Sequence, residues 1–309
     1  MKHFINLKDI PAKDLRKIIT DAKKRKNLRK KLSTLEVDNG APLKGKMLIQ
    51  MFEKTSLRTR ISFYLAIKQL GGGTLTLRPN ELHLGQGGES ISDTAKILST
   101  YGDGFMLRTN SDKKIENFRD YLSIPIINGL SPSSHPTQVL SDIFTVEEII
   151  EKPVSKINIC WVGDSNNVLN SLIAASVKFS FKLSIGCPKK FEPSKKVKAW
   201  VKNNNKKIFV YNDPRKAAIG ADVIFSDKVI SLNDKLNKHK KIEKFKKFKI
   251  DKKLMSFAKK DCIFLHCLPR GSEVSNEVFF GKNSHVWQQA LNRVHVQKSI
   301  LLYCFGKLR

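Results

Sequence analysis

Acidic residues are scarce in this sequence: 28 Asp and Glu stand against 57 Lys and Arg, a formal net charge of +29. A positive field of this size attracts polyanions whatever the fold. The basic residues are nevertheless spread along the chain, most densely between Lys235 and Lys252, and we do not interpret their pattern as the aromatic–basic interleaving of a single-strand nucleic-acid surface. We therefore interpret the charge as a solvated surface, with no specific nucleic acid as partner. A basic nucleic-acid-binding protein is the alternative from another class of function.

Cysteine pairs and long apolar runs are also missing. The five cysteines are odd in number, widely scattered and without a C-x-x-C pair, which argues against disulfides and a metal site and predicts reduced thiols. The longest apolar runs, such as 157–162, are of strand length and far short of a membrane span. Residues 1–15 lack the unbroken apolar stretch of a secretory signal, so we expect a cytoplasmic protein without a membrane partner.

Glycine-rich nucleotide motifs are absent as well. The sequence contains no G-x-x-x-x-G-K-[ST], and the run Gly71 to Gly73 follows a predicted helix, where it is typical of a C-cap and turn. The segment Gly163 to Asn167 follows a predicted strand but lacks the second and third glycines of a dinucleotide fingerprint. We therefore expect no nicotinamide site, and no metal or organic cofactor.

The chain does contain alternating strand and helix patterns. Apolar spacing predicts helices over 12–32, 61–70, 136–150 and 286–305. Short apolar or β-branched runs predict strands over 46–52, 104–108, 157–162, 182–186, 207–211, 222–226 and 262–266. This alternation, over 309 residues, predicts an α/β fold of two domains, each a parallel sheet flanked by helices. We expect the lysine-rich stretch after Asn233 to form a loop.

The segment that follows the predicted strand 46–52 combines several features of a phosphate site. Ser56 and Thr59 lie where a helix should begin, and a helix N-terminus offers free N–H groups and a positive dipole end. Arg58 and Arg60 add guanidinium groups, whose planar forks bind phosphate oxygens in pairs. The combination predicts that this loop binds a phosphate.

Three further motifs follow this loop: Arg108 after a predicted strand, His135-Pro136-Thr137-Gln138, and His266-Cys267-Leu268-Pro269-Arg270. With the loop they make the chain resemble the aspartate/ornithine carbamoyltransferase family over essentially its whole length. The resemblance implies a carbamoyl phosphate-binding domain of residues 1–136, an amino-acid-binding domain of 137–285, and a C-terminal helix, 286–309, that packs back on the first domain. It also implies that carbamoyl phosphate is bound by Ser56, Leu57, Arg58, Thr59, His83, Arg108, His135, Gln138, Cys267, Leu268 and Arg293.

The resemblance implies catalytic roles for Arg108, His135 and Cys267. Attack by an amine turns the carbamoyl oxygen into an oxyanion, and donors already aimed at that oxygen stabilise the transition state more than the ground state. Arg108 and His135 are the candidates for this task. Cys267 is expected beside the amine, which its sulfur would hold in the neutral form. A buried, inert cysteine is the alternative.

The second substrate is indicated by the paired asparagines and by Cys267, which resemble the ornithine branch of the family. Ornithine carries an α-ammonium group, a carboxylate and a δ-amine. Asp227 can pair with the ammonium group, while Asn167 and Ser231 can donate to the carboxylate. The expected ornithine-binding residues are Asn166, Asn167, Asp227, Ser231 and Leu232. The implied reaction converts carbamoyl phosphate and L-ornithine into L-citrulline and phosphate, a step of arginine biosynthesis or of a urea-cycle type.

Four positions and one segment depart from the pattern of that branch. Leu57 stands where Thr is usual, and Pro269 runs directly into Arg270-Gly271 without the usual intervening residues. Leu232-Asn233 replace a familiar Met-Gly, which suggests another amine, such as putrescine or an acylated ornithine, as the alternative acceptor. His83 stands where Gln is more common. In similar proteins the loop around His83 reaches into a neighbouring subunit, which implies a homotrimer, or a multiple of trimers, with shared active sites.

Overall fold

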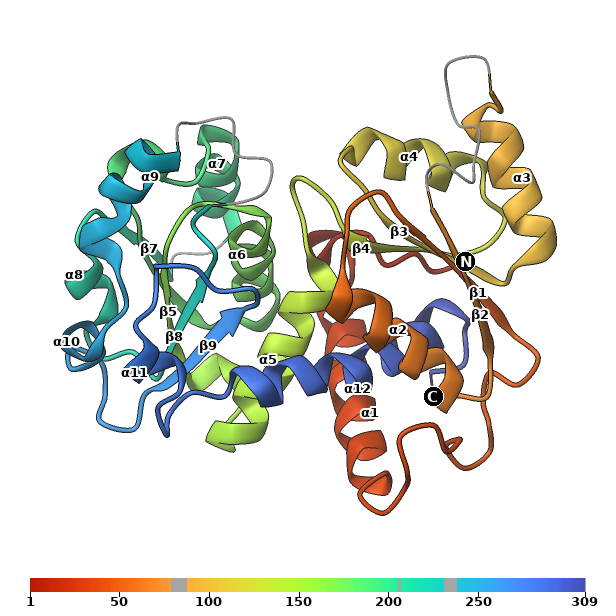
Figure 1. Ribbon diagram of the computed structural model, residues 1–309, viewed down its shortest axis with the longest axis horizontal. Helices are drawn as coiled ribbons and strands as arrows, with labels where there is room; N and C mark the ends of the chain where they lie inside the picture. Colours follow the sequence, from red (N-terminus) through yellow and green to blue (C-terminus); the bar gives the residue numbers. More distant parts are fainter. Residues whose placement is uncertain (79–87, 205–206, 231–237, 309) are drawn as a thin grey trace. The chain divides into compact units, whose positions relative to one another are not determined.

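The computed structural model describes residues 1–78, 88–204, 207–230 and 238–308. The chain divides into two compact units (Figure 1), which are Met1–Phe144 with Leu291–Arg309, and Thr145–Ala290. Among the described residues no helix is both long enough and apolar enough to cross a membrane. The domain boundaries expected from the sequence stay a prediction.

Unit 1 is built on a parallel sheet whose strands lie in the order β2-β1-β3-β4. Every residue of β1 after Met47 is buried, because helices cover both faces of the sheet. Figure 1 shows α3 and α4 on one face and α1, α2 and α12 (Val286–Cys304) on the other. The elements of this unit, besides α12, are α1 (Ala12–Leu28), β1 (Met47–Phe52), α2 (Leu57–Gln69), β2 (Gly73–Leu77), α3 (Ile91–Tyr101), β3 (Gly104–Arg108), α4 (Asp112–Tyr121), β4 (Ile126–Leu130) and the first part of α5 (Pro136–Ile150).

Unit 2 contains a second parallel sheet, of order β7-β6-β5-β8-β9. Phe245, Phe248 and Leu254 pack with Ile224 and Phe264 of the sheet in one buried cluster. The elements of this unit are β5 (Asn158–Val162), α6 (Asn167–Phe179), β6 (Lys182–Gly186), α7 (Lys195–Asn204), β7 (Ile208–Tyr211), α8 (Pro214–Ala218), β8 (Val223–Asp227), α9 (Lys238–Phe245), α10 (Lys252–Met255), β9 (Ile263–Cys267) and α11 (Asn276–Phe279).

The last helix, α12 (Val286–Cys304), returns to unit 1 from Leu291 onward, as expected. Buried polar contacts hold it there. Lys298 is fully buried and its Nζ lies 2.7 Å from Asp38 Oδ2, while Ser299 donates to Asp21 over 2.6 Å. An unpaired charge at buried Lys298 or Asp38 would be costly, so these contacts fix where α12 lies.

The predicted α/β fold is confirmed, with two parallel sheets flanked by helices. Each predicted strand and helix exists, with ends that differ by a few residues: the first helix ends at Leu28 rather than at residue 32, and α2 begins at Leu57 rather than at residue 61. Strands β2 and β4 were not predicted. All five cysteines are free thiols, as predicted.

The prediction of a loop after Asn233 is wrong for the described part of that stretch. From Lys238 the chain forms α9 and then a short 3-10 helix that ends at Phe248. Lys241, Phe245 and Phe248 are buried on one side of it. Their helical spacing anchors the segment to the core, although lysines fill most of the positions between them.

In each sheet the strand order reverses direction at one place, which lies between two loops. In unit 1 the chain leaves β1 toward β2 on one side and then crosses to β3 on the other. In unit 2 it leaves β5 toward β6 and β7 on one side and then crosses to β8 on the other. In open parallel sheets ligands bind at such a reversal, outside the carboxyl ends of the strands. The loops after β1 and β3, and those after β5 and β8, are therefore where sites are expected.

Candidate functional site

The loop after β1 ends in a capped helix N-terminus. Ser56 is the N-cap of α2, with extended backbone angles, and its Oγ accepts a hydrogen bond from Thr59 N over 3.3 Å. The neighbouring N–H groups of the first turn, including that of Arg58, are the donors that a helix start offers to an anion. The side chain of Leu57 is 71% exposed, so its contribution to such a site would come from its backbone.

Arg58, Arg108 and Arg293 surround His135 in unit 1. His135 is buried, and burial, followed by the charges of Arg293, Arg108 and Arg58, lowers its pKa well below the ordinary value. Its imidazole is therefore neutral at physiological pH. Burial and the charge of Arg58 also lower the pKa of Arg108, to about 10. Like charges held this close repel each other, and an anion among them would relieve the repulsion.

Arg108 ends β3 and lies opposite Phe52, the last residue of β1. Among the described residues its Nε is buried without a hydrogen-bond partner. The pKa of Lys54, in the neighbouring loop, is lowered by burial and then by the positive charge of Arg108. Two cationic side chains thus converge at the carboxyl ends of adjacent strands.

The third arginine comes from the far end of the chain. Arg293 is 2% exposed and donates to Gln138 Oε1 over 2.7 Å and to Thr59 Oγ1 over 2.8 Å. Gln138 in turn donates to Asp142 Oδ1 over 2.7 Å. These bonds join α12, α5 and the first turn of α2, so the structure brings Arg293, Gln138 and Thr59 together, as the sequence motifs suggested.

Sequence reasoning missed the role of Glu53 in shaping this site. Its carboxylate pairs with Lys114, accepts from the hydroxyl of Thr109 and from Asn110 N, and its own N–H donates to Arg108 O over 2.9 Å. Burial alone would raise the pKa of Glu53, but the bonds from Lys114 and Thr109 lower it. Glu53 therefore ties the loop after β1 to the loop after β3. The only sign of this role in the sequence is that a carboxylate stands immediately after a predicted strand.

In unit 2, the loop after β5 meets the end of β8 through Asn166 and Asp227. Asn166 is the N-cap of α6, and its Oδ1 accepts from Val168 N and Leu169 N. Its Nδ2 donates to Asp227 Oδ2 over 2.7 Å. The bend that allows this contact passes through Gly163, whose φ of 151° favours glycine. Asn167 is the first residue of α6, beside this contact.

Asp227 is a carboxylate of unusual basicity. Desolvation by burial raises its pKa to about 6, although the interactions with His266, Lys228 N and Asn166 oppose the rise. It also lies opposite Cys267, because β8 and β9 pair in register from Val223 and Ile263 onward. Carboxylate, amide and thiol thus occur at one edge of the sheet, where a cationic amino acid would find a partner.

The motif at the end of β9 is held by a buried pair. His266 Nε2 lies 3.1 Å from Glu273 Oε1, and His266 N donates to Gln289 Oε1 over 3.0 Å. Burial alone would raise the pKa of Glu273, but the bonds from His266 and Gly271 N lower it. Cys267 is half-buried, and the Leu268-Pro269 peptide that follows it is cis. His266 therefore stabilises the end of β9 from within the core and does not line the candidate site.

A second buried pair lies beside the Asn166 loop. Lys241 of α9 is 5% exposed, and its Nζ lies 2.6 Å from Asp164 Oδ2 and 5.6 Å from the ring centre of Phe191. It joins the loop after β5 to the helix that follows residues 231–237. Apart from one lysine at a buried helical position, no sequence pattern indicates this pair.

Three of the sequence-predicted residues, His83, Ser231 and Leu232, lie outside the described residues. The others fall into two sets. Ser56, Leu57, Arg58, Thr59, Arg108, His135, Gln138 and Arg293 belong to unit 1, and Asn166, Asn167, Asp227, Cys267 and Leu268 belong to unit 2.

Comparison with known proteins accounts for both sets. The model of the aspartate/ornithine carbamoyltransferase carbamoyl-P binding domain matches residues 2–148, and that of the Asp/Orn binding domain matches residues 155–304. The chain belongs to the aspartate/ornithine carbamoyltransferase family. It is 41% identical over 307 residues to the ornithine carbamoyltransferase of Agrobacterium fabrum, an alignment that covers 99% of this chain and 98% of that one.

Solved structures of the family have the same fold. The ornithine carbamoyltransferase of Pyrococcus furiosus is 37% identical and superposes with a TM-score of 0.92, over 99% of this chain and 97% of that one. The anabolic ornithine carbamoyltransferase of Campylobacter jejuni is 36% identical, with a TM-score of 0.89 and full coverage of both chains. The family's two-domain architecture therefore extends over the whole length of this chain.

Proposed function

We propose that this protein transfers the carbamoyl group of carbamoyl phosphate to the δ-amine of L-ornithine, giving L-citrulline and phosphate. The observation that carries the proposal is the cluster of Arg58, Arg108 and Arg293 around a neutral, buried His135 at the strand reversal of unit 1. Family membership and the ornithine carbamoyltransferases most similar to the chain support the same reaction.

The phosphate half of carbamoyl phosphate fits the start of α2. Backbone N–H groups after Ser56 and the guanidinium of Arg58 offer donors and positive charge to its oxygens. Thr59 and Leu57 complete this turn. Binding would offset the repulsion between Arg58 and Arg108 that lowers the pKa of Arg108.

The carbamoyl oxygen fits between Arg108, His135 and the Gln138–Arg293 pair. As the amine attacks, this oxygen gains negative charge, and Arg108 can stabilise it with a full positive charge. Burial and three cationic neighbours keep the imidazole of His135 neutral. A neutral ring still carries one N–H group, which can donate a hydrogen bond to the carbamoyl oxygen without releasing its proton. Gln138, held by Arg293 and Asp142, is placed to bind the carbamoyl amide.

Ornithine fits the groups at the strand reversal of unit 2. Asp227, above its pKa of about 6, is the partner for the α-ammonium group, and Asn166 orients it. Asn167, with Ser231 and Leu232, is assigned to the carboxylate and the side chain. Cys267, opposite Asp227 in the sheet, is assigned to the δ-amine.

The chemical step follows from these assignments. The neutral δ-amine attacks the carbamoyl carbon, a tetrahedral intermediate forms, and the bond from carbon to the phosphate oxygen breaks. The amine loses one proton, which the departing phosphate takes. The balance needs no oxidant and no metal ion, and the residues named above supply the charge stabilisation.

Citrulline formation tests the proposal. The purified protein, given carbamoyl phosphate and L-ornithine between pH 7 and 9, is expected to form citrulline and phosphate in equal amounts. A panel with putrescine and an acylated ornithine, at fixed carbamoyl phosphate, then decides the acceptor. Failure to form citrulline would remove the proposal, and preference for putrescine, which has no carboxylate, would remove the role of Asn167 and Ser231.

The assembly and the location of the protein belong to the same proposal. A homotrimer, or a multiple of trimers, with the His83 loop completing a neighbouring site is supported by family resemblance. Mixing a His83→Ala variant with an Arg108→Ala variant tests it after reversible dissociation: hybrid trimers would recover activity that neither variant has alone. A cytoplasmic location is part of this proposal.

A further inference from the structure

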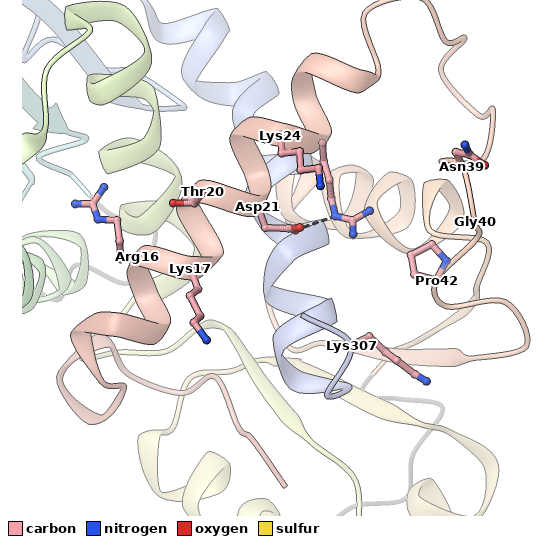
Figure 2. Close-up of a pocket in the computed structure, with 10 residues that line it drawn as sticks. Arg16, Lys17, Thr20, Asp21, Lys24, Asn39, Gly40, Pro42 and Lys307 are labelled. Atoms are coloured by element: carbon pink, nitrogen blue, oxygen red, sulfur yellow. Dashed lines mark hydrogen bonds and ion pairs between the residues drawn. The ribbon is translucent and has the colours of Figure 1, made fainter. Parts of the chain in front are cut away.

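Unit 1 contains a cavity that shares no residue with the site described above. Its volume is about 670 Å³, within the range of about 300 to 1,000 Å³ typical of small-molecule sites. Figure 2 shows that its lining comes from three segments, which are helix α1, the loop 39–42, and Lys307 just after α12. None of these segments has a role in carbamoyl transfer as proposed here.

The charge of the lining exceeds the basic bias of the chain. Over the whole sequence basic residues outnumber acidic ones by about two to one, at 57 to 28. In the cavity they do so by five to one, because Asp21 is the single carboxylate among the lining residues. The five cations are Arg16, Lys17, Lys24, Arg25 and Lys307.

Asp21 does not offset most of this charge. Its Oδ2 already accepts from Arg25 Nε over 2.8 Å and from Ser299 Oγ over 2.6 Å. For Lys17, Lys24 and Lys307, in contrast, no carboxylate among the described residues lies within ion-pair distance. The exposed side chains of Thr20 and Asn39 add polar hydrogen-bonding groups to the same wall.

We propose that this cavity binds a small molecule that carries two or more phosphate groups. Lys17 and Lys24 lie two helical turns apart, about 10 Å along α1. A single phosphate group bound at one of these lysines does not reach the other. The second lysine can therefore bind a second phosphate group. Lys307 comes from a separate segment, so it would contact the ligand from another side. Arg16 and Arg25 supply the planar donors that phosphate prefers.

Calorimetric titration with inorganic pyrophosphate in phosphate-free buffer of low ionic strength tests this site. The unmodified protein is expected to show two classes of binding, because the cluster around His135 also attracts phosphate groups. Arg58→Ala should remove one class. Lys24→Glu combined with Lys307→Glu should weaken the other at least tenfold and leave citrulline formation unchanged, so the two sites are separated whether or not the proposed function holds.

A charge-matched control is available in unit 2. Lys195 and Lys196 are exposed on α7, and changing both to Glu alters the net charge by the same amount. This control should keep both classes of pyrophosphate binding. If Lys24→Glu with Lys307→Glu melts early, Lys17→Gln with Lys24→Gln gives a neutral test of the same wall. The proposal is wrong if the cavity variants titrate like the control, or if Arg58→Ala abolishes all binding.

Discussion

The guanidinium of Arg293 lies 2.7 Å from the amide oxygen of Gln138, although 155 residues separate the two in the sequence. The same guanidinium lies 2.8 Å from the hydroxyl of Thr59. One side chain near the end of the chain thus joins two segments whose motifs the sequence places far apart. Because α12 is fixed to unit 1 by Lys298 and Asp38, the fold itself holds this arrangement.

Replacing Arg293 by Lys should weaken carbamoyl phosphate binding. One ammonium group cannot reproduce the two directed bonds to Gln138 and Thr59, so Gln138 would lose its fixed orientation. We expect the KM for carbamoyl phosphate to rise by about tenfold or more, which corresponds to about 1.4 kcal/mol. Steady-state kinetics measures this. Arg119→Lys, at an exposed arginine of α4, is the control, and an unchanged KM in Arg293→Lys would contradict the assignment.

Replacing Arg108 by Ala should abolish turnover while the fold remains. Arg108 is the cation proposed to face the oxyanion, and loss of one oxyanion donor typically lowers kcat by about 10²- to 10³-fold. Removing it also relieves repulsion with Arg58, so thermal stability should not fall sharply. Citrulline assays and thermal melting test both statements. A kcat near that of the unmodified protein would remove Arg108 from this role.

The parts of the fold that could be predicted are those with a local pattern. Strands such as β3 and β6 are short apolar runs, and their bounds matched the prediction because both faces of a parallel sheet are buried. Strand β2 was missed because it alternates Gly, Thr and Leu and is only partly buried. Helix α9 was missed because its anchor, Lys241, is a charged residue that is buried only through its pair with Asp164.

The residues of the candidate site also divide into those that a sequence motif indicates and those that it does not. Ser56, Arg108 and His135 stand in recognisable motifs, so the sequence indicated them and their neighbours. Glu53 and Glu273 were not indicated, because each acts by holding a partner, Lys114 or His266, whose proximity depends on the tertiary fold. No spacing rule along the chain encodes such contacts. The raised pKa of Asp227 likewise depends on burial, which composition does not show.

Breaking the Lys241–Asp164 pair should destabilise unit 2 and disturb ornithine binding. Lys241→Met leaves the Asp164 carboxylate without its cation in a largely buried place, which costs about 3 kcal/mol. Lys252→Met is the control, because it breaks a pair with Glu277 whose side chains are 76% and 62% exposed, at a cost below about 0.5 kcal/mol. Denaturant unfolding should separate the two variants. Equal losses of unfolding free energy in the two variants would mean that the Lys241–Asp164 pair stabilises the fold no more than the exposed Lys252–Glu277 pair does.

The KM for ornithine should rise with this change more than that for carbamoyl phosphate. Asp164 lies two residues before Asn166, so a shift of this loop moves the amide that orients Asp227. Lys252 has no such connection. Kinetics of Lys241→Met with each substrate varied in turn would show the difference, and a rise confined to carbamoyl phosphate would contradict it.

The affinity for the amino acid should fall as the pH drops through about 6. The pKa of Asp227 is raised to about 6 by burial, so its carboxylate is charged above that pH and neutral below it. The first pH unit below the pKa lowers the charged fraction from about one half to about one tenth, and each further unit lowers it by about tenfold. L-Norvaline, which has the α-amino and carboxylate groups of ornithine but no δ-amine, isolates this effect from titration of the nucleophile.

We therefore expect the inhibition constant of L-norvaline to be nearly flat from pH 7 to 8 and to rise by about fivefold between pH 6 and pH 5. Asp227→Asn should weaken inhibition at pH 8 and remove most of the pH dependence, since an amide neither pairs as an anion nor titrates. Asp261→Asn, at an exposed position of the same unit, should behave like the unmodified protein. A constant that stays flat from pH 5 to pH 8 would show that Asp227 does not hold the α-ammonium group.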